Sequence, residues 1–302
     1  MSRSQESRKL RLFPQVAPGL ALIFSLALSH GVQAQSPLQV TRVSTIYESA
    51  YWGNQVETFS SRGTNLGSVA TVIHPTGLAF DSSGNLYISS DDRPNYKILK
   101  VAPDGTVTTF ASTGLGYPHG LVFDAAGNLF VANSGLNIIR KFAPDGTSTV
   151  FADESDGLST PIDLIFDRAG NLYVSNGYGG PSGTGSVLKF TPDGTVSTFA
   201  DSGFQTAYGL AFDHSGNLYV SNADGGWIEE FSRKGVDLGV FGNAQLFQPL
   251  GIVFDRDGNL YVANSKSNNI EKLSPTGEDL GVFAMTSFAP HFLKIVSPAH
   301  AQ

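Results

Sequence analysis

The sequence predicts an all-β fold: a six-bladed β-propeller of four-stranded antiparallel blades, with one blade shared between the N- and C-terminal segments. Three observations carry this prediction. A motif of the form FDxxGNLYV occurs five times, its aspartates stand 43, 43, 46 and 42 residues apart, and the chain ends contain complementary parts of a sixth copy. A period in the low forties built from short strands is typical of propeller blades. The motif aspartates are Asp81, Asp124, Asp167, Asp213 and Asp255.

One repeat shows how each strand of a blade is predicted. Residues 78–80 form a short apolar inner strand, and the segment Asp81–Asn85 makes a turn, because Asp bonds the backbone ahead of it and Gly and Asn tolerate positive φ. Residues 86–88 begin a second strand rich in β-forming side chains. Residues 97–101 alternate polar and apolar side chains, as a half-buried third strand does. After a Pro-Asp-Gly turn, residues 106–110 form the outer strand, which completes four strands.

The two ends of the chain supply the sixth blade. Residues 46–70 align with the back half of the last repeat and resemble a blade that lacks its inner strand. Residues 289–295 resemble an inner strand with nothing after it. Pairing the two segments closes the ring and protects strand edges that would otherwise stay unpaired. We therefore expect a single propeller domain over residues 35–302.

The first 34 residues have the pattern of a secretory signal peptide. A basic start is followed by the apolar core Val16–Leu28, and Val32-Gln33-Ala34 resembles a cleavage site. The apolar core is too short to span a bilayer. We expect cleavage near Ala34, a mature chain without a membrane span, and a secreted or periplasmic location.

Composition limits the possible partners. The chain has no cysteine, which excludes disulfides and thiolate chemistry. Residues 35–302 contain 15 basic and 25 acidic residues, a net charge of −10, with no basic cluster. This charge argues against binding of nucleic acid or anionic lipid. We expect a monomer whose partner is a small molecule, a glycan or a peptide.

The starts of the inner strands should converge at one mouth of the channel. Each start has a proline, or Ala207, followed by one of Thr76, His119, Ile162, Tyr208, Leu250 and His291. His119, Tyr208 and His291 fall on alternate blades, which is the arrangement of a three-point site across a channel. Because imidazole is a common metal ligand, these three residues are candidate ligands of a divalent cation such as zinc. His74 and Gln248, which precede two of the prolines, are further candidates for ligand binding at the mouth.

A second ring of side chains follows the second strands. It contains Asn133, Asn176, Asn222 and Asn264, with Ser90 at the matching position. Asparagine oxygens can bind calcium, although hard cations prefer carboxylates. The favoured alternative is structural, because Asn side chains also cap loops by bonding nearby backbone. Both interpretations place these residues at the channel mouth.

The GNLYVAN-type repeats, with their Pro-x-Gly strand starts and Pro-Asp-Gly turns, resemble the NHL-repeat family of six-bladed propellers over essentially everything after residue 40. The resemblance implies the fold, and functions that range from protein binding to a few enzymes. Related propellers with gluconolactonase-like or regucalcin-like activity hold a divalent cation in the channel. A gluconolactonase-like site would need a channel glutamate, and none stands at the inner-strand starts.

The strand starts are also similar to those of the peptidylglycine α-hydroxyglycine amidating lyases. In those enzymes three histidines that follow prolines on alternate blades hold zinc. His119 and His291 match two of these positions, and Tyr208 stands at the third. The resemblance further implies catalytic roles for Asp163, in a Pro-x-Asp start, and for Tyr178. We expect ligand or protein binding at the channel face; the alternative is a metal-dependent lyase or, less favoured, a lactonase-like hydrolase.

Overall fold

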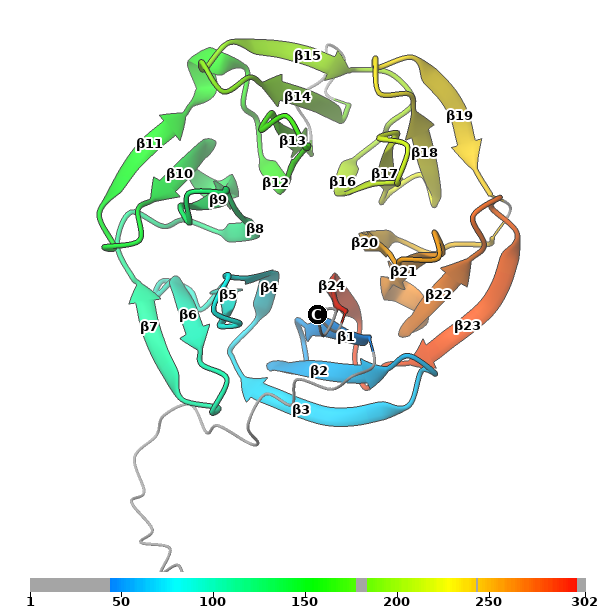
Figure 1. The fold of residues 1–302 in the computed structure, drawn as a ribbon, viewed down its shortest axis with the longest axis horizontal. Helices are drawn as coiled ribbons and strands as arrows, with labels where there is room; N and C mark the ends of the chain where they lie inside the picture. The colour runs from blue at the N-terminus through cyan, green and yellow to red at the C-terminus, as the bar shows by residue number, and fades with distance from the viewer. Residues whose placement is uncertain (1–43, 178–183, 243, 298–302) are drawn as a thin grey trace, which may run out of the picture. The chain divides into compact units, whose positions relative to one another are not determined.

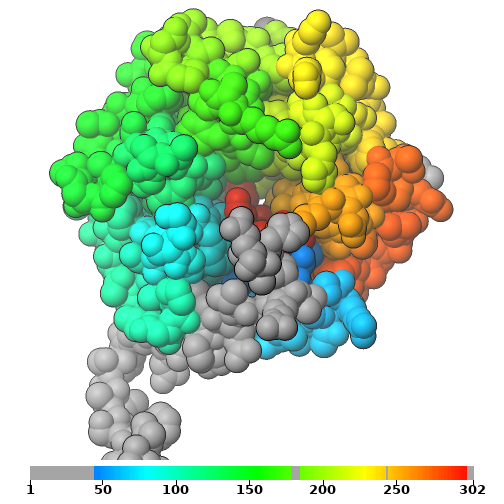
Figure 2. Space-filling view, viewed as in Figure 1, coloured from blue at the N-terminus to red at the C-terminus, as the bar shows by residue number. Residues whose placement is uncertain are grey.

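In a computed structural model of the chain, residues 44–177, 184–242 and 244–297 are described, and they form six four-stranded antiparallel sheets. The sheets stand around a common axis, and the blades pack side by side around the centre (Figures 1 and 2). The six-bladed all-β prediction is therefore confirmed. The predicted signal peptide and Tyr178 lie outside these residues. No helix within them is long and apolar enough to cross a membrane.

Five blades are formed by consecutive strands, and we call them the continuous blades 2 to 6. Blades 2 and 3 consist of β4 (Pro75–Phe80), β5 (Leu86–Ser90), β6 (Lys97–Val101), β7 (Val107–Ala111), β8 (Pro118–Phe123), β9 (Leu129–Asn133), β10 (Ile138–Phe142) and β11 (Ser148–Ala152). Blades 4 to 6 consist of β12 (Pro161–Phe166), β13 (Leu172–Asn176), β14 (Ser186–Phe190), β15 (Val196–Ala200), β16 (Ala207–Phe212), β17 (Leu218–Asn222), β18 (Trp227–Phe231), β19 (Asp237–Phe241), β20 (Pro249–Phe254), β21 (Leu260–Asn264), β22 (Asn269–Leu273) and β23 (Asp279–Met285). Short 3₁₀ turns occur at Ser134–Leu136, Glu154–Asp156 and Ser265–Ser267.

The sixth sheet, which we call the shared blade, joins the two ends of the propeller. Its inner strand is β24 (Pro290–Val296), followed outward by β1 (Thr45–Ala50), β2 (Gln55–Ser60) and β3 (Asn65–Thr71). The β24–β1 pairing places Ile295 opposite Ile46 and Leu293 opposite Glu48. The closure predicted from the chain ends is confirmed.

The recurring FDxxGN motif forms a tight turn between the first two strands of a blade. In blade 2, Asp81 Oδ1 accepts backbone N–H bonds from Ser83 and Asn85, both at 2.9 Å. The Asn85 side-chain amide then donates to Asp81 Oδ2 at 2.7 Å. The same Asp–Asn pairing recurs at Asp124, Asp167 and Asp255. The residues that recur in the motif therefore specify the turn.

Aromatic rings pack between neighbouring blades. Tyr219 lies with its ring centroid 4.8 Å from those of both Phe241 and Phe254, in edge-to-face contact. Tyr87 makes the same double contact with Phe110 and Phe123. Edge-to-face pairs are a favoured arrangement of buried rings. These contacts fill the space between the blades and leave the inner strands to line the axis.

Each inner strand contains a bulge directly after its first residue. In blade 3, Pro118 pairs with Asn133, but the next pair is Leu121 with Val131, so His119 and Gly120 form the bulge. The same shift occurs in the other four continuous blades and after Pro290 in β24. Bulges re-aim side chains locally. In this fold they determine which side chains lie near the channel.

Candidate functional site

Serine side chains hold the bulged residues in place. Ser89 and Ser175 donate 2.5 Å hydrogen bonds to the backbone carbonyls of His119 and Tyr208, each on the next blade. Ser49 accepts the backbone N–H of Phe292 at 2.9 Å. Each bulge is therefore tied to the second strand of its own or the preceding blade, which fixes the residues at the channel.

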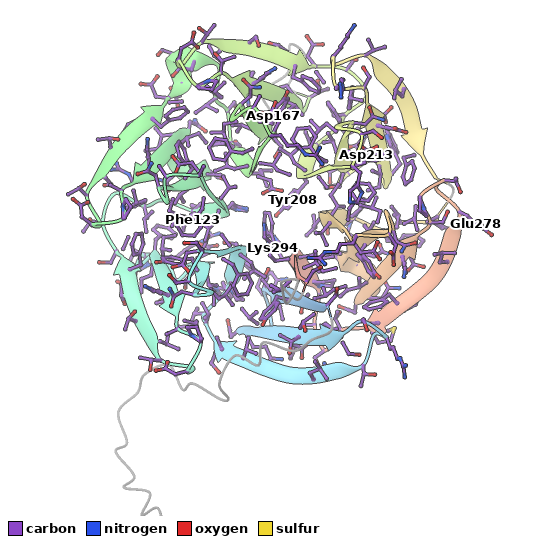
Figure 3. The ribbon with its side chains drawn as sticks, viewed as in Figure 1. Phe123, Asp167, Tyr208, Asp213, Glu278 and Lys294 are labelled. Atoms are coloured by element: carbon purple, nitrogen blue, oxygen red, sulfur yellow. The ribbon has the colours of Figure 1, made fainter. Side chains whose placement is uncertain are left out.

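His119, Tyr208 and His291 converge, although they come from three alternate blades. Tyr208 Oη lies 2.6 Å from Nε2 of His291. The ring centroid of His119 lies 5.8 Å from that of His291 and 6.4 Å from that of Tyr208. Phe292 packs against the same rings, 5.8 Å from Tyr208. Tyr208 lies near the centre of the ring (Figure 3). We call these four residues the axial cluster.

The axial cluster is electrically neutral. Burial lowers the pKa of His119 to about 4, and burial together with the nearby His119 places the pKa of His291 well below its ordinary value. Both imidazoles are therefore uncharged at neutral pH. Within the described ranges, Nδ1 of each histidine is buried without a hydrogen-bond partner. The cluster thus offers two unused polar atoms beside a tyrosine–histidine pair.

The residues at the strand starts do not fit a calcium-like cation. Thr76, Ile162 and Leu250 alternate with the axial residues, so the six residues that directly follow the first residue of each inner strand include no carboxylate. Hard cations need several oxygen ligands. Nε2 of His291 is already engaged by Tyr208. In the described part of the chain, no group of three or more His, Cys, Asp or Glu side chains could hold a metal ion. Zinc binding by His119, Tyr208 and His291 would require this hydrogen bond to break.

The asparagines at the ends of the second strands form hydrogen bonds with backbone groups. Asn133 accepts the N–H of Gly116 at 2.7 Å and donates to the carbonyl of Gly114 at 2.8 Å. Asn176, Asn222, Asn264 and Ser90 make corresponding bonds. The segment they hold precedes the inner strand of the same blade; Asn222 Oδ1 also accepts the backbone N–H of Gly225 at 3.3 Å, in the loop that leaves the second strand. The side-chain oxygens of the four asparagines already accept backbone N–H groups, and the Ser90 hydroxyl donates to a backbone carbonyl, so all five residues position the mouth loops.

Of the two residues that precede a proline and were predicted at the mouth, one joins an aromatic group. The His74 ring stacks on Tyr51, with centroids 4.7 Å apart and planes inclined by 16°. Trp52 contacts both rings and is 67% exposed. We call Tyr51, Trp52 and His74 the aromatic platform. Gln248 instead accepts the backbone N–H of Ser265 through its own carbonyl.

Sequence reasoning missed the residues that support the platform. Tyr51 Oη donates to the buried carboxylate of Asp91 at 2.6 Å, and burial with this carboxylate raises the pKa of Tyr51 to about 12. Arg93 bonds the same carboxylate at 3.3 Å and lies 3.9 Å above the Tyr117 ring. Tyr51 also lies 5.4 Å from His291, which connects the platform to the axial cluster. The adjacent aromatic residues Tyr51 and Trp52 were the available signal in the sequence.

Asp163 lies in the channel as the second bulged residue of blade 4, directly after Ile162, whose position contributes to the axial cluster in other blades. Its Oδ1 accepts the N–H of Leu164 at 2.8 Å, and its Oδ2 accepts the N–H of Leu210 at 2.9 Å. Burial nevertheless raises its pKa to about 6. Asp163 and Lys294, which sequence reasoning did not single out, line one cavity of about 170 Å³.

Solved structures with similar folds include a chain of a nidogen–laminin complex, with a TM-score of 0.72 at 19% identity over 84% of this chain and 99% of that chain. A gluconolactonase from Xanthomonas campestris has a TM-score of 0.60 at 24% identity over 71% of this chain and 77% of that chain. A putative gluconolactonase has a TM-score of 0.61 at 23% identity over 71% and 79%. At these identities the likeness shows the fold alone.

Sequence comparison gives a more specific result. No curated protein matches this chain significantly. Residues 91–291, more than half of the chain, match the family described as SMP-30/Gluconolactonase/LRE-like region. The comparisons do not confirm the specific NHL-repeat and amidating-lyase resemblances. The chain therefore belongs to the SMP-30/gluconolactonase/LRE-like family of six-bladed propellers.

Proposed function

We propose that this protein is a binding module that holds a small, uncharged, ring-shaped ligand of the sugar or sugar-lactone type on its aromatic platform. The observation that carries the proposal is the exposure of Trp52 beside the stacked rings of Tyr51 and His74. A large exposed aromatic surface bordered by polar groups is characteristic of binding sites. Tyrosine and tryptophan offer a flat apolar face together with a polar edge, which suits a ring that carries hydroxyl groups.

The polar groups beside the platform favour an uncharged ligand. Asp91 and Arg93 form an ion pair, so their charges offset each other. The Arg93 side chain is 55% exposed and retains N–H donors that can reach ring oxygens. The match to the SMP-30/gluconolactonase/LRE-like family supports a ligand derived from a sugar.

The test is a ligand-binding measurement with glucose and glucono-δ-lactone, by ligand-observed NMR and calorimetry. Trp52→Ala should weaken binding about tenfold, the loss of roughly 1.4 kcal/mol of ring contact. Leu238→Ala is the matched control, because Leu238 is 54% exposed on the outer strand β19, away from the mouth. Equal affinity of the two variants, or no binding of either sugar compound, would contradict the proposal.

A hydrolase or lyase is the second candidate, favoured by one observation. Tyr208 Oη lies within 2.6 Å of Nε2 of the uncharged His291, and such a pair can relay a proton to or from a bound substrate. In the metal-dependent form, His119, Tyr208 and His291 would be ligands, with Asp163 and Tyr178 in support. Elemental analysis of protein from its native compartment decides: near-stoichiometric metal that His119→Ala removes supports this candidate. Metal-free protein whose stability is unchanged by added zinc or calcium contradicts the metal-dependent form.

A further inference from the structure

The inner ring of strands departs from sixfold symmetry at two opposite junctions. The second bulged residue is a glycine in four blades: Gly77, Gly120, Gly209 and Gly251. A Cβ on Gly77 would lie 2.2 Å from the carbonyl oxygen of His119, so side chains are excluded where neighbouring inner strands approach this closely. Blade 4 has Asp163 at this position and the shared blade has Phe292. Neighbouring inner strands share fewer contacting residues at the two junctions that follow, β12 with β16 and β24 with β4.

The cavity beside these junctions contains one acidic and one basic side chain. Residues from all six inner strands line its roughly 170 Å³, and those strands contain no Asp, Glu, Lys or Arg other than Asp163 and Lys294. The position of Lys294 is occupied in the continuous blades by Ala79, Val122, Ile165, Ala211 and Val253. Strands β12 and β24 face each other across the ring (Figure 1), and Lys294 lies near its centre (Figure 3).

The two charged residues line the same cavity without forming an ion pair with each other. Asp163 is held by the backbone N–H groups of Leu164 and Leu210, which fixes its orientation and leaves lone pairs for a further donor. Among the described residues, no carboxylate forms an ion pair with the Lys294 ammonium, and no group forms a hydrogen bond with it. Asp163 is nevertheless the charge that most favours the ammonium form of Lys294. A molecule placed between the two groups could bond both.

We propose that this cavity is a binding site for a small zwitterionic amino acid, with the ligand carboxylate at Lys294 and the ligand ammonium at Asp163. The walls are otherwise apolar side chains and strand backbone, where an unpaired charge is costly. A zwitterion leaves no net charge beside the Asp163–Lys294 pair, whereas a simple anion or cation would. A cavity of about 150 Å³ holds benzene, so this one has room for a ligand of about six heavy atoms. This site is separate from the aromatic platform.

The test is calorimetric and NMR titration of residues 35–302 with glycine, β-alanine and γ-aminobutyrate, whose charges are increasingly far apart. At least one should bind saturably, and glycolate should bind more weakly because it lacks the ammonium group. Lys294→Val and Asp163→Gly introduce the residues that blade 3 has at these positions. Each should reduce affinity about 30-fold or more, the usual cost of removing one partner of a buried charge pair.

The outcomes separate this site from the platform. Trp52→Ala should leave amino-acid binding unchanged, so failure of the sugar proposal does not affect this one. Absence of binding by all three amino acids, glycolate binding as tight as theirs, or unchanged affinity in Lys294→Val would each overturn the proposal. Lys294→Val decides alone if Asp163→Gly does not fold.

Discussion

The shared blade differs from the continuous blades mainly at the positions nearest the channel. One residue of the second strand is buried and aliphatic in every continuous blade: Ile88, Val131, Val174, Val220 and Val262. The shared blade has Glu48 there, also fully buried. Phe292 replaces a small residue and Lys294 an aliphatic one in the same blade, and its β1–β2 loop supplies Tyr51 and Trp52. The repeats thus specify the ring, and the blade that closes it carries most of the unusual chemistry.

The largest effect should come from adding a side chain at the second bulged position of a continuous blade, where four of the blades have glycine. Gly77→Ala would bring its Cβ to 2.2 Å from the carbonyl oxygen of His119, a backbone atom that cannot turn away. We expect a loss of about 3 kcal/mol in the free energy of unfolding, the upper range for overpacking. Denaturant unfolding measures it. Gly67→Ala is the control, because a Cβ there meets no atom within 4 Å, although its φ of +101° adds backbone strain.

If Gly77→Ala costs no more than Gly67→Ala, close approach of the inner strands is not what requires glycine. The presence of Phe292 at this position would then need an explanation other than the smaller number of contacts between β24 and β4. A larger cost for Gly77→Ala would show that the ring tolerates side chains only at the two junctions where Asp163 and Phe292 stand.

The second prediction concerns the replacement of Glu48, the buried carboxylate of the shared blade. Burial, with Glu57 opposite on β2, raises the pKa of Glu48 well above its ordinary value, and the nearby backbone N–H of His291 only partly opposes this. Glu48→Val gives the shared blade the residue of four continuous blades. We expect it to stabilise the protein at pH 7 by about 1–3 kcal/mol, the cost of burying an uncompensated polar group.

The pH dependence of this gain follows from the direction of the shift. Because the folded pKa of Glu48 lies above its unfolded value, the folded state binds more protons at this group, and the contribution of Glu48 to stability falls as pH rises above about 4.3. The stability difference between Glu48→Val and wild type should therefore grow with pH from that point. Glu48→Gln is the control: it removes the titration but keeps a buried polar group. Parallel pH profiles of wild type and Glu48→Val would contradict the prediction.

The sequence predicted the ring well because the ring depends on local patterns. Asp81 and Asn85 specify a turn through bonds within five residues, and the complementary ends predicted the shared blade. Alternate placement of His119, Tyr208 and His291 predicted that they would lie together. The distances between these three side chains, in contrast, depend on the bulge in each inner strand. The residues of the repeat motif do not predict this bulge.

The rest of the candidate site depends on contacts distant in sequence. Tyr51 and Asp91 are 40 residues apart and meet through the side-by-side arrangement of the shared blade and blade 2. The position of Lys294 directly precedes the position that is a phenylalanine in the other repeats. Because the sequence was compared only at the strand starts, Lys294 was not singled out. Aligning every inner-strand position would have shown it as a lysine among aliphatic residues.

The smallest expected effect concerns the hydrogen bond within the axial cluster. Tyr208→Phe removes the hydroxyl that bonds Nε2 of His291 and leaves this nitrogen without that partner inside the channel. We expect a loss of about 1–2 kcal/mol in unfolding free energy, the usual cost of such a deletion. Tyr173→Phe in blade 4 is the matched control, because its hydroxyl makes only a 3.4 Å contact with Asp167 and should cost less than about 0.5 kcal/mol. Equal losses in the two variants would mean that the bond between Tyr208 and His291 adds nothing to the closure of the ring. A clear difference would show that a residue of a continuous blade and one of the shared blade stabilise each other across the channel.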